Sequence, residues 1–355
     1  MLNRFVPLVS LLICCFLFFN LQLIFIESDQ RDFNSFHLNP EAQISEESKE
    51  SISLQPKDKI NGVMKDVITF TNSKLFSQTL MDTATLAIIG NIKKKTIKIT
   101  SRSALQLSKY FEDLSLETVD AEDLCGKTKT PGCQEWTQVT AESYLNNNES
   151  SEGITILRDS LPSLVLENID IVKNIFTSNL RKDAVNTVQK YFQSLKKKLK
   201  SDDVTFVSIN VNRNINTKNL VRPVDELFFH FCLGEFLKKY PDSVFIVISD
   251  NILWSRQHLK HERIMFPDMK SNIAKDVLDL TLLTQVNHSI YDYGGLGFWG
   301  AVMAGGETML ADKYYNPSDP TFRDDILTAL QHNTPADWNL VDVTDIYLLP
   351  WLNML

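Results

Sequence analysis

Residues 276–312 constrain the fold of this chain more than any other stretch, because they read as one βα unit with its loops. Residues 276–284 are apolar at helical spacing, and residues 289–293 form a short strand. A glycine turn follows, residues 298–304 begin a second helix, and residues 308–311 form the next strand. The order of these elements predicts part of a parallel α/β sheet.

The turn between the strand and the second helix carries Gly294, Gly295 and Gly297, and Gly305-Gly306 end that helix. Glycine lets a ligand approach the backbone closely, and the start of a helix offers unpaired N–H groups and a partial positive charge to a phosphate. The pattern therefore predicts a site for a nucleotide diphosphate. A turn that serves only close packing of the helix on the strand fits the same residues equally well.

The N-terminal segment predicts a membrane anchor. Residues 6–26 are apolar and carry no charge, and a helix of this length can cross a bilayer. Arg4 precedes the run and Glu27 follows it, so residues 1–5 are expected to form a cytoplasmic tail and the body to be luminal. A cleaved signal peptide is the alternative, but the run is long for one and no small residues mark a cleavage site. Residues 27–62 are polar and acidic and are expected to form a stem.

Beyond the anchor, the 355-residue chain is long enough for two domains of ordinary size. Its 43% hydrophobic and 23% charged residues are typical of a globular protein. A formal net charge of −8 argues against a nucleic-acid partner, because such a partner usually requires a basic face.

The alternation of strands and helices predicts parallel α/β layers in two parts of the chain, residues 63–200 and residues 201–355. The elements expected in the first are strands at 67–71 and 96–100 and helices at 78–89, 103–114 (capped by Ser103) and 170–200. Those expected early in the second are strands at 204–211 and 244–249 and a helix at 225–240.

Cysteine and asparagine residues carry three further expectations. Cys125 and Cys133 bracket a loop with Gly and Pro, and a luminal body makes a disulfide between them an expectation. Cys232 lies on a phenylalanine-rich predicted helix and is expected to be a buried thiol. Asn148 begins a glycosylation sequon in a polar loop, whereas no glycan is expected at the second formal sequon, at Asn287.

Two predicted strands of the second domain end in polar residues. The strand at 204–211 leads to Arg213, whose guanidinium can hold a phosphate by two hydrogen bonds. The strand at 244–249 leads to Asp250-Asn251, at the end where open α/β sheets bind ligands. A plain strand exit with a surface arginine is the alternative reading of Arg213.

The run LLTQVNHSI, followed by GGLGFWGAVMAGG, resembles the most characteristic motif of the α-1,2-fucosyltransferases. In that family Leu-Thr-Gln-x-Asn-His-Ser/Thr-Ile leads into Gly-Thr-Phe-Gly-Phe-Trp and a Gly-Gly pair. The matching residues are Leu283, Thr284, Gln285, Asn287, His288, Ser289, Ile290, Gly294, Gly297, Phe298, Trp299, Gly305 and Gly306. Gly295-Leu296 stand where the family has Thr-Phe.

The resemblance covers roughly residues 67–343, with departures in two places. Gln78 and the following Ala-Thr-Leu match a family helix, but the family's preceding glycines are absent, and Phe76 is expected to obstruct a backbone approach there. The family's His-Val-Arg-Arg-Gly-Asp-Tyr aligns with a segment in which only Val211 and Arg213 remain. Ile215 stands in the place of the aspartate.

The resemblance implies an α/β, GT-B-like fold of two Rossmann-like domains behind a transmembrane helix, in the Golgi membrane with single-pass type II orientation. It implies inverting transfer of fucose from GDP-fucose to the 2-hydroxyl of a terminal β-galactose on a glycan. No metal or other cofactor is expected, which agrees with the absence of an Asp-x-Asp triplet from the sequence.

The resemblance also implies roles for single residues. The implied donor-binding residues are Asn210, Arg213, Ser249, Asp250, Asn287, Gly294, Gly295 and Gly297. Gln78 is implied on the acceptor side, and Asp250, Asp292 and His288 are the candidates for a catalytic base. The alternative is a catalytically dead, membrane-anchored family member that binds a glycan or protein partner, which the departures from the family motifs favour.

Overall fold

The computed structural model describes residues 67–70, 75–114, 116–119, 136–146, 154–213, 223–315 and 324–346. The predicted tail, anchor and stem lie outside these residues, as do Cys125, Cys133 and Asn148. Among the described residues, no helix is long and apolar enough to cross a membrane.

The first sheet contains five strands, and all its neighbouring strands run parallel, in the order β3-β2-β1-β5-β4. The strands are β1 (Val67–Phe70), β2 (Thr96–Thr100), β3 (Glu117–Val119), β4 (Trp136–Val139) and β5 (Ile154–Leu157). Every residue of β1 and β5 is buried, as expected of central strands in a parallel sheet covered on both faces.

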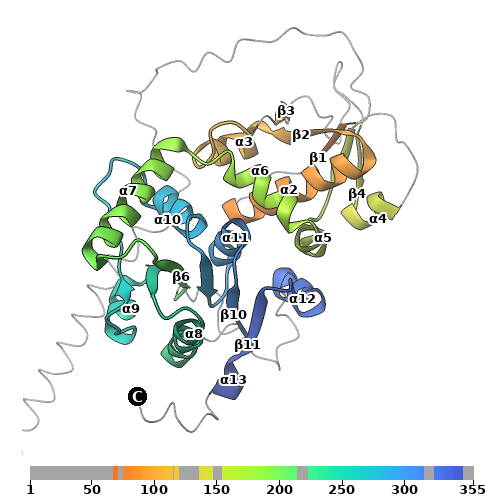
Figure 1. Cartoon of the computed structure of the whole chain (residues 1–355). Coiled ribbons are helices and arrows are strands. Elements are labelled where there is room, and N and C mark those ends of the chain that lie inside the picture. Colours follow the sequence, from red (N-terminus) through yellow and green to blue (C-terminus); the bar gives the residue numbers. More distant parts are fainter. Residues whose placement is uncertain are drawn as a thin grey trace, which may run out of the picture. The chain divides into compact units, whose positions relative to one another are not determined.

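Helices that follow or connect these strands complete the N-terminal part, shown in orange to green in Figure 1. They are α2 (Phe76–Lys93), α3 (Ser101–Ser108), α4 (Ala141–Asn146), α5 (Pro162–Glu167), α6 (Ile169–Thr177) and α7 (Lys182–Leu199). The predicted cap of α3 is wrong: the helix begins at Ser101, and the Thr100 side chain accepts a hydrogen bond from the Ser103 N–H. Phe76 stacks on the ring of Tyr110 with 3.8 Å between centroids.

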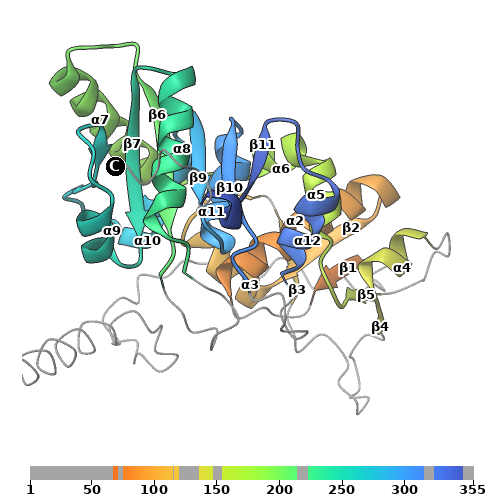
Figure 2. The same ribbon diagram turned by 90° about the horizontal axis from the view of Figure 1, so that it is seen from below.

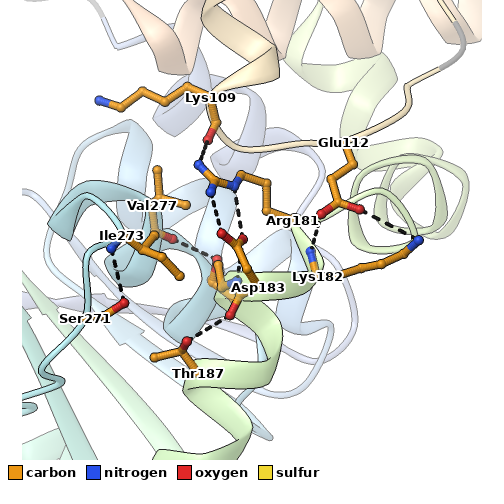
Figure 3. A network of polar contacts seen from close by, with 11 residues as sticks. Lys109, Glu112, Arg181, Lys182, Asp183, Thr187, Ser271, Ile273 and Val277 are labelled. Carbon is orange, nitrogen blue, oxygen red and sulfur yellow. Dashed lines mark hydrogen bonds and ion pairs between the residues drawn. The ribbon is translucent and has the colours of Figure 1, made fainter. Parts of the chain in front are cut away.

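The predicted single helix over residues 170–200 is also wrong, because the chain breaks between α6 and α7. Leu180 forms an antiparallel bridge with Phe111, and the Arg181 N–H donates to the Tyr110 carbonyl at 3.1 Å. The Arg181 guanidinium contacts Asp183 and the Lys109 carbonyl, as Figure 3 shows. The bridge at Leu180 and the bond from the Arg181 N–H use backbone groups that would otherwise pair within a continuous helix.

The second sheet contains six parallel strands in the order β11-β10-β9-β6-β7-β8. They are β6 (Thr205–Val211), β7 (Ser243–Ser249), β8 (Ile264–Met265), β9 (His288–Tyr291), β10 (Thr308–Asp312) and β11 (Trp338–Asp342). Figure 2 shows β7, β6, β9, β10 and β11 side by side. Numbered along the chain, this is the doubly wound order 3-2-1-4-5-6, which reverses direction between β6 and β9.

Helices cover both faces of the second sheet. They are α8 (Glu226–Lys239), α9 (Ile252–His258), α10 (Lys275–Thr284), α11 (Gly295–Ala304), α12 (Asp325–His332) and α13 (Val343–Ile346). The side chains of β7 alternate: Val244, Ile246 and Ile248 belong to the core cluster that contains α10 and α11, and Phe245 and Val247 to the cluster that contains α8. The predicted α/β class with parallel sheets is confirmed.

Direct contacts join helices that flank the two sheets. The Trp299 Nε1–H on α11 donates to the Ser77 carbonyl on α2 at 3.0 Å. Asp276, on α10, accepts hydrogen bonds from Lys109 and from the Tyr110 hydroxyl. The division into domains at residue 200 falls between the two sheets and stays a prediction.

Candidate functional site

Polar residues follow the carboxyl ends of three neighbouring strands at one edge of the second sheet. Asn212 and Arg213 follow β6, Asp250 follows β7, and Asp292 follows β9. In doubly wound sheets, ligands bind outside the carboxyl ends of the strands at the point where the strand order reverses, which here lies between β6 and β9. The fold therefore brings these predicted site residues to the edge where a ligand is expected.

Asp292 is sealed between the ends of β6 and β9. Its side chain is 0% exposed, and its two carboxylate oxygens accept backbone N–H bonds from Asn212 at 2.8 Å and Tyr293 at 2.7 Å. Burial raises the pKa of Asp292 well above its usual range, although both hydrogen bonds act in the opposite direction. Asp292 therefore fixes the geometry of this edge but is closed to a substrate hydroxyl.

Arg213 is held in one orientation. Its backbone N–H donates to Asp250 Oδ1 at 2.8 Å, and one guanidinium nitrogen donates to the Val224 carbonyl at 2.7 Å. The guanidinium carbon lies 3.5 Å from the centre of the Trp254 ring. Burial lowers the pKa of Arg213, but an arginine starts so high that it stays charged. A guanidinium has five N–H donors, and the bond to Val224 uses one of them. A fixed cation that can donate further hydrogen bonds therefore lies beside the end of β6.

The glycine turn leads directly into α11. Gly294 has φ 90°, a conformation that favours glycine, and a Cβ there would lie 2.7 Å from Asn212 Nδ2. At Gly297 a Cβ would lie 2.7 Å from Tyr291 Cβ and 2.9 Å from Asn210 Oδ1. The helix thus rests on β9 and covers Asn210, which is 6% exposed. Among the described residues no side chain caps α11, so its first N–H groups are available to an anion. The close packing of the helix on the strand is observed, and the phosphate site at the turn stays a prediction.

Ser249 and Asn251 shape the start of α9. The Ser249 hydroxyl accepts the Asn251 N–H at 3.0 Å, and Asn251 Oδ1 accepts the Trp254 N–H at 3.0 Å. This turn presents Trp254 to Arg213 and leaves the exposed Asp250 at the strand end.

Asn287 and His288 lie at the other end of β9. The Phe206 N–H donates to Asn287 Oδ1 at 2.9 Å, at the amino end of the sheet. His288 Nδ1 accepts the Glu307 N–H at 3.0 Å, and its ring stacks on Tyr240 at 4.5 Å. Burial lowers the pKa of His288. A strand advances about 3.3 Å per residue, so the length of β9 separates these two residues from the edge that holds Asp292. The structure does not bring them to the other predicted site residues.

Gln78 lies on α2, at the carboxyl edge of the first sheet. Its amide nitrogen donates to Asp82 Oδ1 at 2.8 Å and to Ser160 Oγ at 2.9 Å. The neighbouring Ser77 packs against the start of α11, since a Cβ at Gly295 would lie 2.6 Å from Ser77 Oγ. Gln78 thus follows directly on the residue where the two sheets meet.

Two tyrosines that the sequence patterns did not indicate also lie at this edge. The hydroxyls of Tyr291 and Tyr293 are buried and have no hydrogen-bond partner within the part of the chain that the structure describes. Both residues line a cavity of about 90 Å³ beside Asp292 and Gly294. In the sequence, these tyrosines could have been noticed because they flank Asp292 at the end of a predicted strand.

A cavity of about 820 Å³ lies elsewhere, among α8, α13 and the strands β10 and β11. No predicted site residue lines it, so its size does not connect it with this edge. In the described ranges, no group of three or more His, Cys, Asp or Glu side chains is arranged to hold a metal ion.

Residues 171–340 match the family model "Glycosyl transferase family 11". The chain is 33% identical over 98 residues to the galactoside alpha-(1,2)-fucosyltransferase 2 of Bos taurus, covering 27% of this chain and 28% of that protein. It is 32% identical over 129 residues to the enzyme of the same name from Rattus norvegicus, covering 34% and 36%. The matches thus span about a third of the length of these curated relatives.

Solved structures show a weaker likeness. The fucosyltransferase NodZ from Bradyrhizobium is 12% identical at a TM-score of 0.43, covering 66% of this chain and 92% of that one. A glycosyl transferase family 9 protein from Veillonella parvula is 12% identical at a TM-score of 0.44, covering 80% and 87%.

Proposed function

We propose, from the premise that this chain is a divergent member of glycosyl transferase family 11, that it transfers fucose from GDP-fucose to the 2-hydroxyl of a terminal β-galactose. The names of its relatives, galactoside alpha-(1,2)-fucosyltransferases, support fucosyl transfer, this linkage and a galactoside acceptor, and GDP-fucose as the donor is what the family resemblance implies. We also propose a GT-B-like arrangement of the two parallel sheets. Ser77 lies beyond the carboxyl end of β1 in the first sheet, Gly295 lies beyond that of β9 in the second, and the two residues are in contact, which supports this arrangement.

One observation carries the proposal: the uncapped start of α11 and the fixed guanidinium of Arg213 lie at the ends of the two strands between which the strand order reverses. A helix N-terminus and an arginine together offer backbone N–H groups, a partial charge and a full charge to a diphosphate. The same charges stabilise GDP as it leaves, without a metal.

Asp250 is the residue that we propose as the base. Asp292 is sealed and His288 lies at the far end of β9, whereas Asp250 is exposed at the edge that holds Arg213. The galactose 2-hydroxyl oxygen bonds to the anomeric carbon of fucose from the face opposite the phosphate. The bond from that carbon to the phosphate oxygen breaks, and the hydroxyl proton passes to Asp250.

The test is calorimetry of GDP binding to the full-length protein and to Arg213→Ala. Loss of a charged hydrogen-bond partner predicts an affinity lower by roughly 10- to 150-fold. Arg256→Ala is the matched control, because Arg256 also lies over an aromatic ring, that of Phe266, but on α9. Equal GDP affinity in wild type and Arg213→Ala would refute the diphosphate assignment.

A second function, binding without transfer, is favoured by the sealing of Asp292 and the remoteness of His288. Asp250→Asn separates the two functions. If the proposed transfer occurs, this variant should bind GDP as the wild type does but transfer fucose to methyl β-galactoside roughly 100-fold more slowly. A wild type that binds GDP and transfers nothing is the result expected of the binding function.

We propose a Golgi membrane location with type II orientation, a single-pass anchor at residues 6–26 and a luminal body. The apolar run and its flanking charges support this proposal. Protease protection of a C-terminal tag in sealed microsomes would test it.

A further inference from the structure

A histidine that the proposed function does not use closes a ring of contacts around Arg213. The Arg213 guanidinium carbon lies 3.5 Å from the centre of the Trp254 ring, and the His258 ring stacks on Trp254 at 4.6 Å with 17° between the planes. His258 Nδ1 lies 3.4 Å from Glu226 Oε1. Glu226 begins α8 two residues after Val224, whose carbonyl accepts a hydrogen bond from the Arg213 guanidinium. The position of Arg213 is therefore connected to His258 through both α8 and α9.

The sequence of α9 produces this stack. Trp254 and His258 are four residues apart, so their side chains lie on the same side of the helix. Asn251 Oδ1 accepts the Trp254 N–H at 3.0 Å and thereby fixes where α9 begins. The ring of Phe229, on α8, meets the Trp254 ring edge-on at 6.4 Å. The indole is thus held between α8 and the end of β6, and His258 lies against it.

Glu226 is the group at ion-pair distance from the His258 ring, and the pair is ionic only when the histidine carries a proton. His230 Nε2, also on α8, donates to the His258 carbonyl at 3.0 Å and not to the ring. The other charged or titratable groups near this ring of contacts come from α8, α9 and the ends of β6 and β7. They are Asp225, Arg256, Arg213 and Asp250. Protonation of His258 therefore changes its interaction with Glu226 most directly.

A proton on His258 also adds a positive charge near the place proposed for the diphosphate. The two ring distances add up to place the His258 ring within about 8 Å of the guanidinium, a distance comparable to the Debye length in physiological salt. The repulsion between the two cations is present with and without ligand, so it does not oppose binding. The attraction between the imidazolium and a diphosphate appears only in the complex, and binding is therefore stronger when His258 is protonated.

We propose that His258 is a positioning residue of the diphosphate site, which in its protonated form pairs with Glu226, holds Trp254 against Arg213 and strengthens binding of the diphosphate of a nucleotide sugar. Histidine side chains change charge between about pH 5 and 8, so donor binding should strengthen as the pH falls through this range. The inference rests on the proposed function for the place of the diphosphate. It adds control of that site by pH.

The test is calorimetry of GDP-fucose binding to the full-length protein at about pH 5.5 and about pH 8. Both phosphates of GDP-fucose are diesters and take up no proton in this range, whereas the terminal phosphate of GDP does. Wild type should bind GDP-fucose roughly 3- to 10-fold more tightly at the lower pH. His258→Gln, which stays neutral, should match the wild type at the higher pH and lack the gain at the lower one.

His258→Arg separates the charge of this side chain from its packing. It keeps a cation that can stack on Trp254 and pair with Glu226 at every pH, so at pH 8 it should bind GDP-fucose as tightly as wild type does at pH 5.5. A merely structural loss would instead weaken binding at both pH values. His261→Gln is the matched control, because His261 is an exposed histidine just after α9 whose Nδ1 accepts the Arg263 N–H at 3.2 Å. This variant should keep the pH dependence of the wild type.

Transfer of fucose to methyl β-galactoside, measured on the same samples, shows which proposal fails. The same pH dependence of GDP-fucose binding in wild type, His258→Gln and His258→Arg overturns the role of His258, even if fucose is transferred. The expected pH dependence without any transfer supports the role of His258 and overturns fucosyl transfer. No binding of GDP-fucose to the wild type at either pH overturns both.

Discussion

At the scale of the residue, a buried polar side chain at a strand end can hold the fold together even where its chemical group suggests a catalytic role. Asp292 looked like a base because it follows a strand beside a glycine turn. In the structure its oxygens are taken by the Asn212 and Tyr293 N–H groups. A carboxyl in that position joins β6 to β9 and shapes the edge that a ligand would meet.

Asp292→Ala should therefore cost stability rather than proton transfer alone. The change leaves the partly buried N–H groups of Asn212 and Tyr293 without their acceptor, and each loss costs about 1–3 kcal/mol. The expected loss of unfolding free energy in urea is about 2–5 kcal/mol. Asp268→Ala, at an exposed aspartate, should change it by less than about 0.5 kcal/mol. A loss no larger than that of the control would contradict the role given to Asp292.

Asp82 gives a prediction about pH. Burial raises its pKa from 3.8 to about 6, and the bond from Gln78 partly offsets this rise. The folded state therefore holds the proton more tightly than the unfolded state. The stability this gives is complete below pH 3.8 and is lost as pH rises through about 6.

Asp82→Asn stays neutral and should lack this loss. Relative to wild type, its unfolding free energy should increase between pH 4 and pH 7 by an amount on the order of 3 kcal/mol. Urea unfolding at pH 4, 5, 6 and 7 measures the difference. A difference that does not vary with pH would show that Asp82 titrates normally.

At the scale of the element, α11 shows why some of the fold could be predicted from sequence. The strand–glycine–helix–glycine–strand order over β9, α11 and β10 was predicted to within a few residues, because periodicity and glycine mark these boundaries locally. The break between α6 and α7 was not, because it depends on pairing between Leu180 and Phe111, which lie far apart in the chain.

The candidate site divides in the same way. Arg213, Asp250 and the glycines were assigned to one donor site, and they lie at one edge of the second sheet because parallel strands bring their carboxyl ends together. Asn287 and His288 were grouped with them because they are adjacent in one sequence motif. The motif runs along β9, so its two halves reach opposite ends of the sheet.

Gly297 provides a test of how closely α11 must lie on β9. In Gly297→Ala the new methyl would meet Tyr291 Cβ at 2.7 Å and Asn210 Oδ1 at 2.9 Å, so helix and strand must separate. We expect a loss of about 1–3 kcal/mol in unfolding free energy and weaker GDP binding. Gly234→Ala, on α8 with open space around its Cβ position, should instead stabilise by about 0.5–1 kcal/mol. Equal effects of the two substitutions would rule out close packing as the reason for Gly297.

At the scale of the whole molecule, the described part from residue 67 onward combines two sheets with one shared core cluster. That cluster contains Ile68 and Leu80 from the first sheet and its helix, and Ile246, Trp299 and Trp338 from the second. Two domains that fold independently would each need a core of their own. The shared cluster predicts that the two sheets unfold together.

Trp299 is the residue that tests this prediction, because its ring lies in the shared core and its Nε1–H donates to the Ser77 carbonyl across the two sheets. Trp299→Phe removes the hydrogen bond and part of the ring, and should lower the unfolding free energy by about 1–3 kcal/mol. Far-UV circular dichroism and tryptophan fluorescence should still report one transition with one urea midpoint in wild type and variant. Trp254→Phe, on α9 and outside the shared core cluster, is the matched control and should cost less. If the two probes gave separate midpoints in the wild type, the boundary at residue 200 would separate two folding units, and Trp299 would lie at their interface rather than in a common core.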